Sequence, residues 1–541
     1  MADARRLVVL VGLAAVLVAG LALGDTNASG GSAQAAELQA PSEAPTVALS
    51  SSWFCAGATV SNGGSAPGAL VITNAGSAIL AASVKLVSHS GRQQKLNVTV
   101  AAGATRTLEE QFPSVHGGPG APWVGALVTL YGGSASVSQL VTSPEGISSQ
   151  PCASSASTNW YFVDGETLRN ATEEISLLNP YPEVAIADLS FTTEYGQEEP
   201  VVFEGVVVPA DGLTVLNLGS HLRRRTRVAV TVSVRTGQVA AFQTELVTPP
   251  PPGAPLVGGN GGLNPASPIA GATLTLGSSA PSTSWWWPEG AEGGGLTERY
   301  LLYNPGGRPA TLSLSLIAQG GGSGGGLGGA TEVTVGPYAT AAVTTNGQPW
   351  ALPGVSYAAH LVSTNGVPVV AERSLVGSSP SPERGLAVLV GQDQPANRWL
   401  LPGSPALALT KLAHVTAPPA PPLPQALLGR VAGVLDQALA GLAASTMAAQ
   451  PSGQLWLEVL DRGRKAAVVE VGSIVRGRLV PLPGTRALIV PAGERGGVLL
   501  PATASGEALV VSSSQAVLVE QDWYGYQPAT GMSLSPAVQL G

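Results

Sequence analysis

Carboxylates gather at one place in the sequence, at a spacing that could bind a cation. Asp164 and Glu166 are followed closely by Glu173 and Glu174, and carboxylate oxygens are the ligands that Ca²⁺ takes in proteins. The other interpretation is that these side chains are solvated on turns, which is the usual state of acidic residues. We therefore predict no metal site here and keep a calcium loop as the alternative.

Other residue types that support catalysis are too dispersed to form a recognisable site. Zinc sites usually draw on a close pair of histidines, whereas the histidines of this chain lie far apart, at His89, His116, His221, His360 and His414. Gly321–Gly325 spells G-x-S-x-G, but glycines surround it where a nucleophile elbow needs a strand before it and a helix after it. The sequence predicts no catalytic residue, no cofactor and no enzyme activity.

One basic group could bind an anion. Arg223, Arg224, Arg225 and Arg227 are the only tightly clustered basic residues. They either pair with an anionic envelope polymer or are solvated in the loop before a strand. We treat them as a candidate ligand or partner surface.

The run Trp285-Trp286-Trp287 is the second candidate surface. Successive side chains of a strand alternate between its faces, so Trp285 and Trp287 share one face and Trp286 takes the other. Exposed rings at Trp286 and Trp287 could stack on a sugar. The alternative is that the run fills a core or covers a seam between domains.

The two cysteines, Cys55 and Cys152, bracket one predicted domain. A cysteine pair in an exported protein most simply forms a disulfide. A redox or metal-binding pair is the alternative, which the lack of a nearby histidine or third cysteine weakens. Closing a loop of about 100 residues stabilises a fold by up to about 4.7 kcal/mol in the loop-entropy description.

Composition excludes some functions and favours a β fold. Only 11% of the 541 residues are charged, while Gly (69) and Pro (44) are abundant, which favours turns over long helices. The net charge of −8 gives no reason to expect nucleic-acid binding, which requires a dense basic surface.

The N-terminus predicts export. Arg5 and Arg6 precede an uncharged apolar run from Leu7 to Gly24, long enough for a membrane-spanning helix and similar to a signal peptide. Basic residues before the run keep that end in the cytoplasm. We therefore expect either a single-pass protein of the cell membrane with its bulk outside the cytoplasm, or a secreted protein if the segment is cleaved.

A pattern recurs about four times and predicts the fold. Each copy opens on Trp and a short run that ends at Gly, in Trp53–Gly57, Trp160–Gly165, Trp285–Gly290 and Trp399–Gly403. An apolar strand follows and ends at a turn that begins with Asn74, Asn179, Asn304 or Asp461.

Each copy then continues with further short strands. Thr311–Leu316 alternates Leu with polar residues, which indicates a half-buried strand. We expect each copy to end in a hairpin, such as Ala358–Ser363 and Val369–Leu375 joined at Asn365-Gly366. Six or seven such strands are typical of a two-sheet sandwich, so the predicted fold class is all-β, with tandem immunoglobulin-like β-sandwiches.

The expected organisation is a signal anchor or signal peptide (1–24), a stalk (25–50), sandwiches 1 (51–153) and 2 (157–248), a linker (249–283), sandwich 3 (284–378), sandwich 4 (397–526) and a tail (527–541). Sandwich 4 contains an insertion, 404–452, in which 425–450 has apolar residues at helical spacing. We expect this helix to pack on its own domain, with a partner-binding or membrane-surface helix as the alternative.

Several features together resemble a known family. They are the Trp53-x-Cys55 motif, Pro151–Ser154, Asn159–Phe162 and the repeated strands that end in Asn-Pro. The chain thereby resembles an actinobacterial family of exported single-pass proteins whose function is unknown, over residues 50–380 and more loosely beyond. The resemblance implies export and repeated β-sandwich domains, and no activity.

These observations lead to one main functional hypothesis and two alternatives. The main one is a non-enzymatic envelope protein that presents β-sandwich surfaces to a cell-envelope polysaccharide or a membrane protein partner. The alternatives are a structural spacer or adhesion-type stalk, and a glycan-active enzyme with dispersed catalytic residues.

Overall fold

The structure is a computed structural model, and it describes residues 41–540 apart from 43–47, 61–63, 109–114, 116–121, 258–265, 292, 319–329, 352–353, 404–452, 476–477, 502–506 and 526–530. The chain divides into the units Met1–Leu38 and Gln39–Gly541, and the described residues belong to the second. The predicted anchor, the predicted helix 425–450, and His116 and His414 lie outside the described residues.

The described residues form an all-β fold, as predicted. Their helical turns are η2 (Val201–Phe203) and η3 (Leu218–Ser220), and the remaining elements are antiparallel strands. No helix within the described part of the chain is long and apolar enough to span a bilayer.

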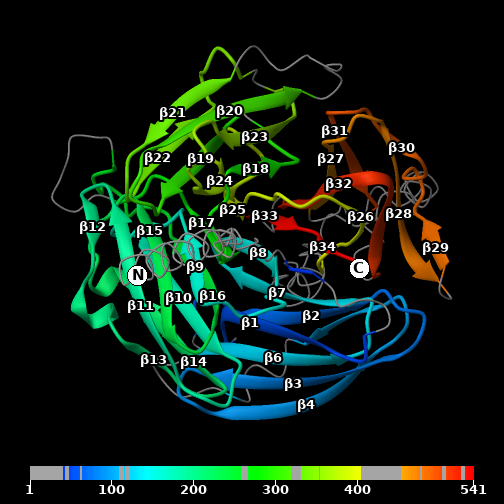
Figure 1. Ribbon diagram of the computed structural model, residues 1–541, viewed down its shortest axis with the longest axis horizontal. Coiled ribbons are helices and arrows are strands. Elements are labelled where there is room, and N and C mark those ends of the chain that lie inside the picture. Colours follow the sequence, from blue (N-terminus) through cyan, green and yellow to red (C-terminus); the bar gives the residue numbers. More distant parts are fainter. Residues whose placement is uncertain are drawn as a thin grey trace, which may run out of the picture. The chain divides into compact units, whose positions relative to one another are not determined.

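The strands fall into four consecutive groups, which we call modules 1 to 4 (Figure 1). Module 1 consists of β1 (Ser51–Thr59), β2 (Gly68–Asn74), β3 (Leu80–Ser88), β4 (Gln93–Val100), β5 (Thr105–Leu108), β6 (Trp123–Tyr131), β7 (Ala135–Ser143) and β8 (Gly146–Pro151). Module 2 consists of β9 (Asn159–Phe162), β10 (Ala171–Asn179), β11 (Ala185–Thr193), β12 (Gly196–Glu198), β13 (Val206–Val208), β14 (Gly212–Asn217), β15 (Val228–Thr236), β16 (Ala240–Val247) and β17 (Gly271–Leu276).

Modules 3 and 4 follow the same plan. Module 3 consists of β18 (Ser284–Trp287), β19 (Leu296–Asn304), β20 (Ala310–Ala318), β21 (Thr331–Val335), β22 (Ala339–Thr344), β23 (Tyr357–Ser363), β24 (Val370–Gly377) and β25 (Gly385–Val390). Module 4 consists of β26 (Ala396–Leu400), β27 (Gly453–Asp461), β28 (Ala467–Val475), β29 (Arg478–Pro481), β30 (Leu488–Val490), β31 (Arg495–Leu500), β32 (Leu509–Gly525), β33 (Gly531–Pro536) and β34 (Val538–Gln539).

One strand order recurs in the four modules. In module 1 the sheet that contains the opening Trp has the order β1-β6-β3-β4, and the second sheet has the order β5-β2-β7-β8. Modules 2 and 3 have the equivalent orders β9-β15-β11-β12 with β14-β10-β16-β17, and β18-β23-β20-β21 with β22-β19-β24-β25. In module 4 the long strand β32 belongs to both halves and joins them into one sheet. We call the two sheets of a module the tryptophan sheet and the central sheet.

The alternating sequence of β20 produces the half-buried strand that was predicted. Leu312, Leu314 and Leu316 are fully buried, while Ser313 and Ser315 on the other face are partly exposed. The three leucines pack between the two sheets of the module, because alternation with a period of two directs them to the same face of the strand.

The predicted turn residues also act as expected. The side-chain amides of Asn74, Asn179 and Asn304 each donate to the carbonyl four residues on, at 2.9, 2.6 and 2.7 Å. Each amide also donates to the carbonyl of a valine that ends a later strand, Val100 of β4, Val208 of β13 or Val335 of β21. One side chain therefore fixes two loops of its module.

The opening tryptophans are core residues in every module. Trp53, Trp160, Trp285 and Trp399 are at most 2% exposed. The indole N–H groups of the last three donate to the carbonyls of Val239, Val369 and Val517. Val239 and Val369 lie just before β16 and β24, and Val517 lies within β32.

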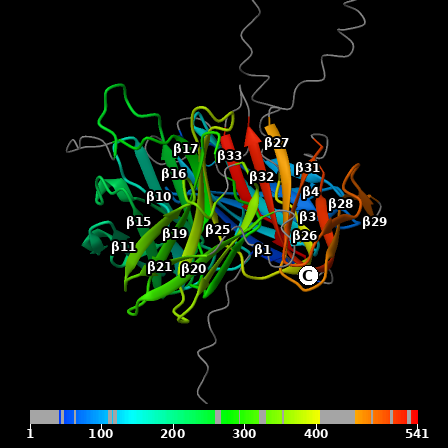
Figure 2. The ribbon, with the colours of Figure 1, turned by 90° about the horizontal axis from the view of Figure 1, so that it is seen from above.

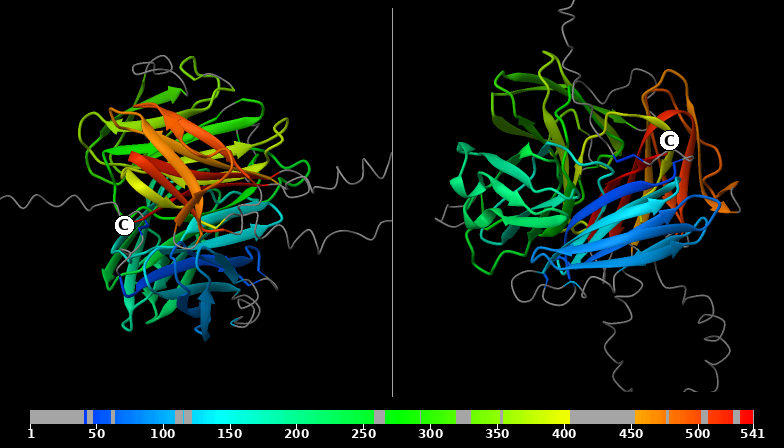
Figure 3. Two further views of the ribbon diagram at one scale, coloured as in Figure 1. Left: turned by 90° about the vertical axis from the view of Figure 1, so that its right-hand side faces the viewer. Right: turned by 60° about the horizontal axis from the view of Figure 1, so that its bottom comes forward.

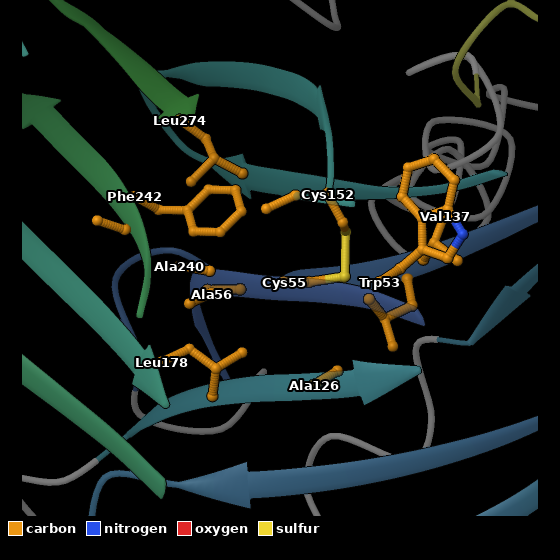
Figure 4. Close-up of a cluster of buried hydrophobic side chains, with 14 of the residues drawn as sticks. Trp53, Cys55, Ala56, Ala126, Val137, Cys152, Leu178, Ala240, Phe242 and Leu274 are labelled. Atoms are coloured by element: carbon orange, nitrogen blue, oxygen red, sulfur yellow. A yellow bond between two sulfur atoms is a disulfide. The ribbon is translucent and has the colours of Figure 1, made fainter. Parts of the chain in front are cut away.

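The predicted disulfide between Cys55 and Cys152 is present, with an S–S distance of 2.06 Å. Figure 4 shows the bond among buried apolar side chains, with Trp53 on one side and Phe242 and Leu274 of module 2 on the other. The disulfide therefore ties β1 to the segment that leaves β8, next to the seam between modules 1 and 2.

The predicted hairpins are wrong. The strands β6 and β7 do not pair with each other, because β6 pairs with β1 and β3 while β7 pairs with β2 and β8. The same holds for β15 with β16 and for β23 with β24. In module 4 the place of a hairpin is taken by the single continuous strand β32. In modules 1 to 3 the chain thus crosses from one sheet to the other at this point instead of reversing within one sheet.

The last strand of each central sheet was not predicted, although these strands connect the modules. We call β8, β17, β25 and β33 the central strands. They contact one another in the closed order β8, β17, β25, β33 and back to β8. Figure 1 shows them in the middle of the four modules, and Figures 2 and 3 show the N-terminal (blue) and C-terminal (red) modules side by side.

Two predicted boundaries therefore need correction. The segment 249–283 was predicted to be a linker, and 527–541 a tail. The first contains β17, whose residues are largely buried, and the second contains β33 and β34. These strands belong to the folded part of the unit.

Close backbone approach explains the glycine that begins each central strand. A Cβ on Gly271 would lie 2.4 Å from the backbone N of Leu386, and one on Gly531 would lie 2.9 Å from the backbone N of Ile147. Cβ atoms on Gly146 and Gly385 would likewise meet the backbone of the next central strand, at 3.4 Å. A side chain at Gly271 or Gly531 would force the backbones of neighbouring central strands apart, whereas 3.4 Å is an ordinary contact distance.

We predict that Gly271→Ala destabilises the protein, because the added methyl overlaps the β25 backbone. Overpacking of this kind typically costs about 1–3 kcal/mol. The melting temperature should fall, whereas Gly219→Ala should change it little, because a Cβ there meets nothing closer than 3.6 Å. Equal melting temperatures for the two variants would contradict the tight central contact.

Candidate functional site

The arginine cluster is only partly available to a ligand. Arg225 forms an ion pair with Glu198 at 2.6 Å and lies over the ring of Tyr195, 5.0 Å from its centroid. The hydrogen bond from Arg225 is the main cause that lowers the pKa of Glu198. Arg227 is partly buried, whereas Arg223 and Arg224 are exposed in the loop before β15.

The tryptophan run alternates as predicted, and it covers a seam. Trp285 and Trp287 are at most 1% exposed, so Trp287 does not belong to a ligand surface. The partly buried Trp286 packs against Leu460 and Leu518 of module 4. Trp286 therefore lies at the contact between modules 3 and 4.

Aromatic and cationic groups enclose the ring of Trp286. His360 stacks on it with ring centroids 3.5 Å apart, and the Arg462 guanidinium lies 4.5 Å from its centroid. Burial, with a smaller contribution from Arg462, lowers the pKa of His360 to about 4. His360 is therefore neutral at pH 7, and its stacking beside the Arg462 cation brings no charge repulsion.

Of the four acidic residues noted in the sequence, Glu173 and Glu174 are buried in β10, so a solvated turn is wrong for these two. Asp164 and Glu166 are partly buried between β9 and β10. Glu173 is fully buried, and Glu174 is 9% exposed. The Gln243 amide donates to Glu173 at 2.8 Å, and the backbone N–H of Asp164 donates to Glu372 of module 3 at 2.7 Å. Module 2 thus contributes these carboxylates to the interior of the unit.

A second buried ionic group joins modules 3 and 4. Arg373 of β24 lies 2.5 Å from Glu520 of β32 and 3.8 Å from Glu298 of β19. Arg495 of β31 pairs with Glu289 at 2.6 Å and with Glu458. All six residues are at most 6% exposed. Solvent and a polymeric substrate do not reach them.

Part of this group has the composition of a metal site. One oxygen each of Glu289, Glu458 and the fully buried Asp522 lies within 4.8 Å of the others. However, Arg495 places its Nη2 atom against both glutamates, so a guanidinium already supplies positive charge between them. We interpret the group as an ion-pair network between modules.

Burial favours the protonated form of several of these acids. It raises the pKa of Glu298 and of Glu372 to about 8, in each case against smaller opposing interactions. It also raises the pKa of Glu520 to about 7, partly offset by Arg373. A protonated carboxyl can donate a hydrogen bond and avoids the cost of an unpaired buried charge.

Sequence analysis missed the members of this network because they stand inside apolar strands. Glu298 lies in β19, Glu372 and Arg373 in β24, and Glu458 in β27. The available signal was the presence of acidic and basic residues inside otherwise apolar runs. An isolated charge is too costly to bury, so such residues indicate that each has a partner elsewhere in the fold.

The raised pKa values predict that stability falls with rising pH. Glu298 and Glu372 are protonated in both states below about pH 4.5, and their stabilising contribution is lost as the pH rises through about 8. Each could contribute on the order of a few kcal/mol, since one unit of pKa shift corresponds to about 1.4 kcal/mol. The melting temperature should therefore be higher at pH 5 than at pH 8.5.

A neutral replacement tests the assignment. Glu298→Gln should reduce this pH dependence, whereas Glu332→Gln, on an exposed position of the same module, should leave it unchanged. A melting temperature that rises between pH 5 and pH 8.5 would show that the buried acids are ionised.

Solvent-accessible cavities lie elsewhere, at the corners between modules. We call the space between the outward face of one tryptophan sheet and the turns of the neighbouring module a corner. The residue after the opening Trp faces each corner: Phe54, Tyr161, Trp286 or Leu400. Trp286 thus occupies a position that the other modules fill with aromatic or apolar residues.

Two corners contain cavities. The corner of modules 1 and 2 encloses about 260 Å³, lined by residues that include Phe54, Lys85, Lys95, Pro180 and Asp211. The corner of modules 4 and 1 encloses about 420 Å³, lined by turns of module 1 with Arg398 and Ile474 of module 4. At the corner of modules 3 and 4, Arg462 covers Trp286 instead.

Comparison with known proteins gives one family match. No curated protein matches the sequence at a significant level. Residues 125–253 match a family of unknown function, DUF5719, and this segment runs from β6 of module 1 through β16 of module 2. The chain is similar over this segment to an uncharacterised family.

Proposed function

We propose that this chain is a non-enzymatic, extracytoplasmic envelope protein whose modules present binding surfaces to a cell-envelope polysaccharide. The observation that carries the proposal is the pair of open polar corner cavities. A rigid set of sandwiches with shallow polar cavities suits recognition of a polymer that passes over its surface.

The placement of the ionisable groups supports binding over catalysis. Glycosidases use two carboxyl groups that flank the sugar bond, about 5–10 Å apart and open to water. The densest groups of carboxyls here are enclosed between modules and paired with arginines. They stabilise the assembly and are not placed to meet a glycan.

Export is supported by two independent features. The apolar segment Leu7–Gly24 follows Arg5 and Arg6, as in a signal anchor or signal peptide. The buried disulfide between Cys55 and Cys152 is of a kind that forms and persists in oxidising compartments. We therefore place the bulk of the chain outside the cytoplasm, held by one membrane segment or secreted.

We further propose that the modules are copies of an immunoglobulin-like sandwich with exchanged edge strands. The pairs β2–β5 and β3–β6 correspond to the B–E and C–F pairs of an immunoglobulin domain. However, β1 occupies the place next to β6 that the last strand takes in that fold, and β7 lies next to β2 where the first strand would lie.

Co-sedimentation with insoluble envelope polysaccharide tests the proposed function. The purified full-length protein should sediment with the polymer, and the same protein reduced and unfolded should remain in the supernatant. No new reducing ends should appear during the incubation. A protein that stays in solution would favour the spacer alternative, and release of reducing ends would favour a glycan-active enzyme.

A further inference from the structure

Two of the four lysines of the chain lie side by side in the cavity between modules 1 and 2. Lys85 of β3 and Lys95 of β4 are register partners across the tryptophan sheet of module 1. Both line the cavity of about 260 Å³, together with hydroxyl groups, the ring of Phe54 and residues from module 2. In a chain so poor in lysine, this is a local concentration of ammonium groups.

The two lysines differ in their electrostatic state. Lys85 is paired with Asp211 of module 2 at 3.0 Å, with 28% and 39% of the two side chains exposed. Lys95 is exposed and has no ion pair with any acidic residue in the described part of the chain. The cavity therefore has an unneutralised positive charge.

Comparison among the modules shows that the fold does not require these lysines. The positions equivalent to Lys85 are Ser190, Ser315 and Gly472, which pair in the same register with β15, β23 and β32, the strands equivalent to β6. Gly472 of module 4 pairs with Pro481 where Lys85 pairs with Lys95. Three modules thus form the same sheet without a cation at the Lys85 position.

Module 2 also contributes a side chain that the fold does not need. Asp211 has a positive φ of 49°, and the equivalent turn positions are Gly103, Tyr338 and Gly493, which also have positive φ. Glycine is the residue that adopts this conformation most easily. At Asp211 a carboxylate is present instead, and it directs Lys85 toward the cavity.

The remaining lining groups indicate what the cavity could bind. Ser52, Ser83 and Thr129 supply hydroxyl groups, and Phe54 supplies a partly buried ring. Hydroxyl groups and aromatic faces contact the polar and apolar sides of a sugar, while a free ammonium group binds a carboxylate or phosphate. A volume of this size accommodates about one sugar unit of a longer chain.

We propose that the corner of modules 1 and 2 binds one anionic, polyhydroxylated unit of an envelope polymer, with Lys95 contacting its acidic group. This proposal rests on the proposed function and names its ligand class. Asp211 acts on the ligand through Lys85, because it neutralises one of the two ammonium groups that face the cavity. The acidic group is either the carboxylate of a uronic acid or the phosphate of a polyol phosphate.

Binding of defined oligomers to the full-length protein tests this. The probes are an oligomer of glucuronic acid, an oligomer of glycerol phosphate and a neutral oligomer of glucose, titrated by calorimetry at low salt. One of the two acidic oligomers should bind, and the neutral one should bind at least about tenfold more weakly, which is the effect of losing one charge-assisted contact.

Three variants assign the site. Lys95→Ala should weaken binding of the acidic oligomer about tenfold, and Lys465→Ala, which removes an exposed lysine of module 4, should not change it. Asp211→Asn should strengthen binding, because it frees the charge of Lys85. A purely structural role of Asp211 would give the opposite sign or no effect, and unchanged melting temperatures of the variants show that each is folded.

The outcomes separate the two proposals. If Lys95→Ala binds the acidic oligomer as well as the wild type does, or if Asp211→Asn binds it more weakly, this site is wrong while the proposed function stands. Equal binding of neutral and acidic oligomers overturns the ligand class. A wild-type protein that binds neither the oligomers nor envelope polysaccharide overturns both proposals.

Discussion

Close contact between the central strands is the constraint on which the rest of the structure depends. Each central strand contacts two others, and glycines at their starts allow the backbones to approach. The central sheets of modules 1 and 2 are also packed against the opening segment of the preceding module in this order. A Cβ on Gly57 would meet Leu274 and Phe242 of module 2, and one on Gly403 would meet Val71 of module 1.

The closed arrangement determines where charged groups can lie. At the seam of modules 1 and 2 the buried contact is mainly apolar, around the disulfide and Phe242. At the seam of modules 3 and 4 it contains Arg373 and Glu520 as an ion pair. Burying such a pair gains little stability, but separating its members would leave uncompensated charges at a large cost. The two seams therefore differ in kind, and an apolar surface in place of either ionic one would leave a buried charge without its partner.

Local features could be predicted from the sequence because their physics is local. The capping amide of Asn304 bonds within its own turn and module, and the alternation around Leu314 reflects one sheet face. The disulfide followed from the number of cysteines and the expected compartment. Each of these inferences needs only neighbouring residues or a count.

The features that were missed depend on contacts between distant parts of the chain. The strands β17 and β33 are short and rich in small or polar residues, because other central strands cover them. They alternate apolar with polar residues over only a few positions, and the glycine- and proline-containing stretches beside them made the two segments resemble a linker and a tail. The crossing from β6 to β7 was missed for a related reason. Gly132-Gly133 permits a reversal within one sheet and a passage to the other equally well, and only the partners of the two strands distinguish them.

Equivalence among the modules separates structural residues from functional ones more sharply than residue type does. A run of three tryptophans suggests a sugar-binding surface, yet the position of Trp286 is aromatic in modules 1 and 2 as well, as Phe54 and Tyr161. Its presence is explained by the seam that these modules share. Sequence analysis did not single out Lys85, because one lysine in a strand does not by itself indicate a site. Compared with Ser190 and Ser315 at the equivalent positions, Lys85 is the residue that the fold does not explain, and it lines a cavity that modules 1 and 2 build together.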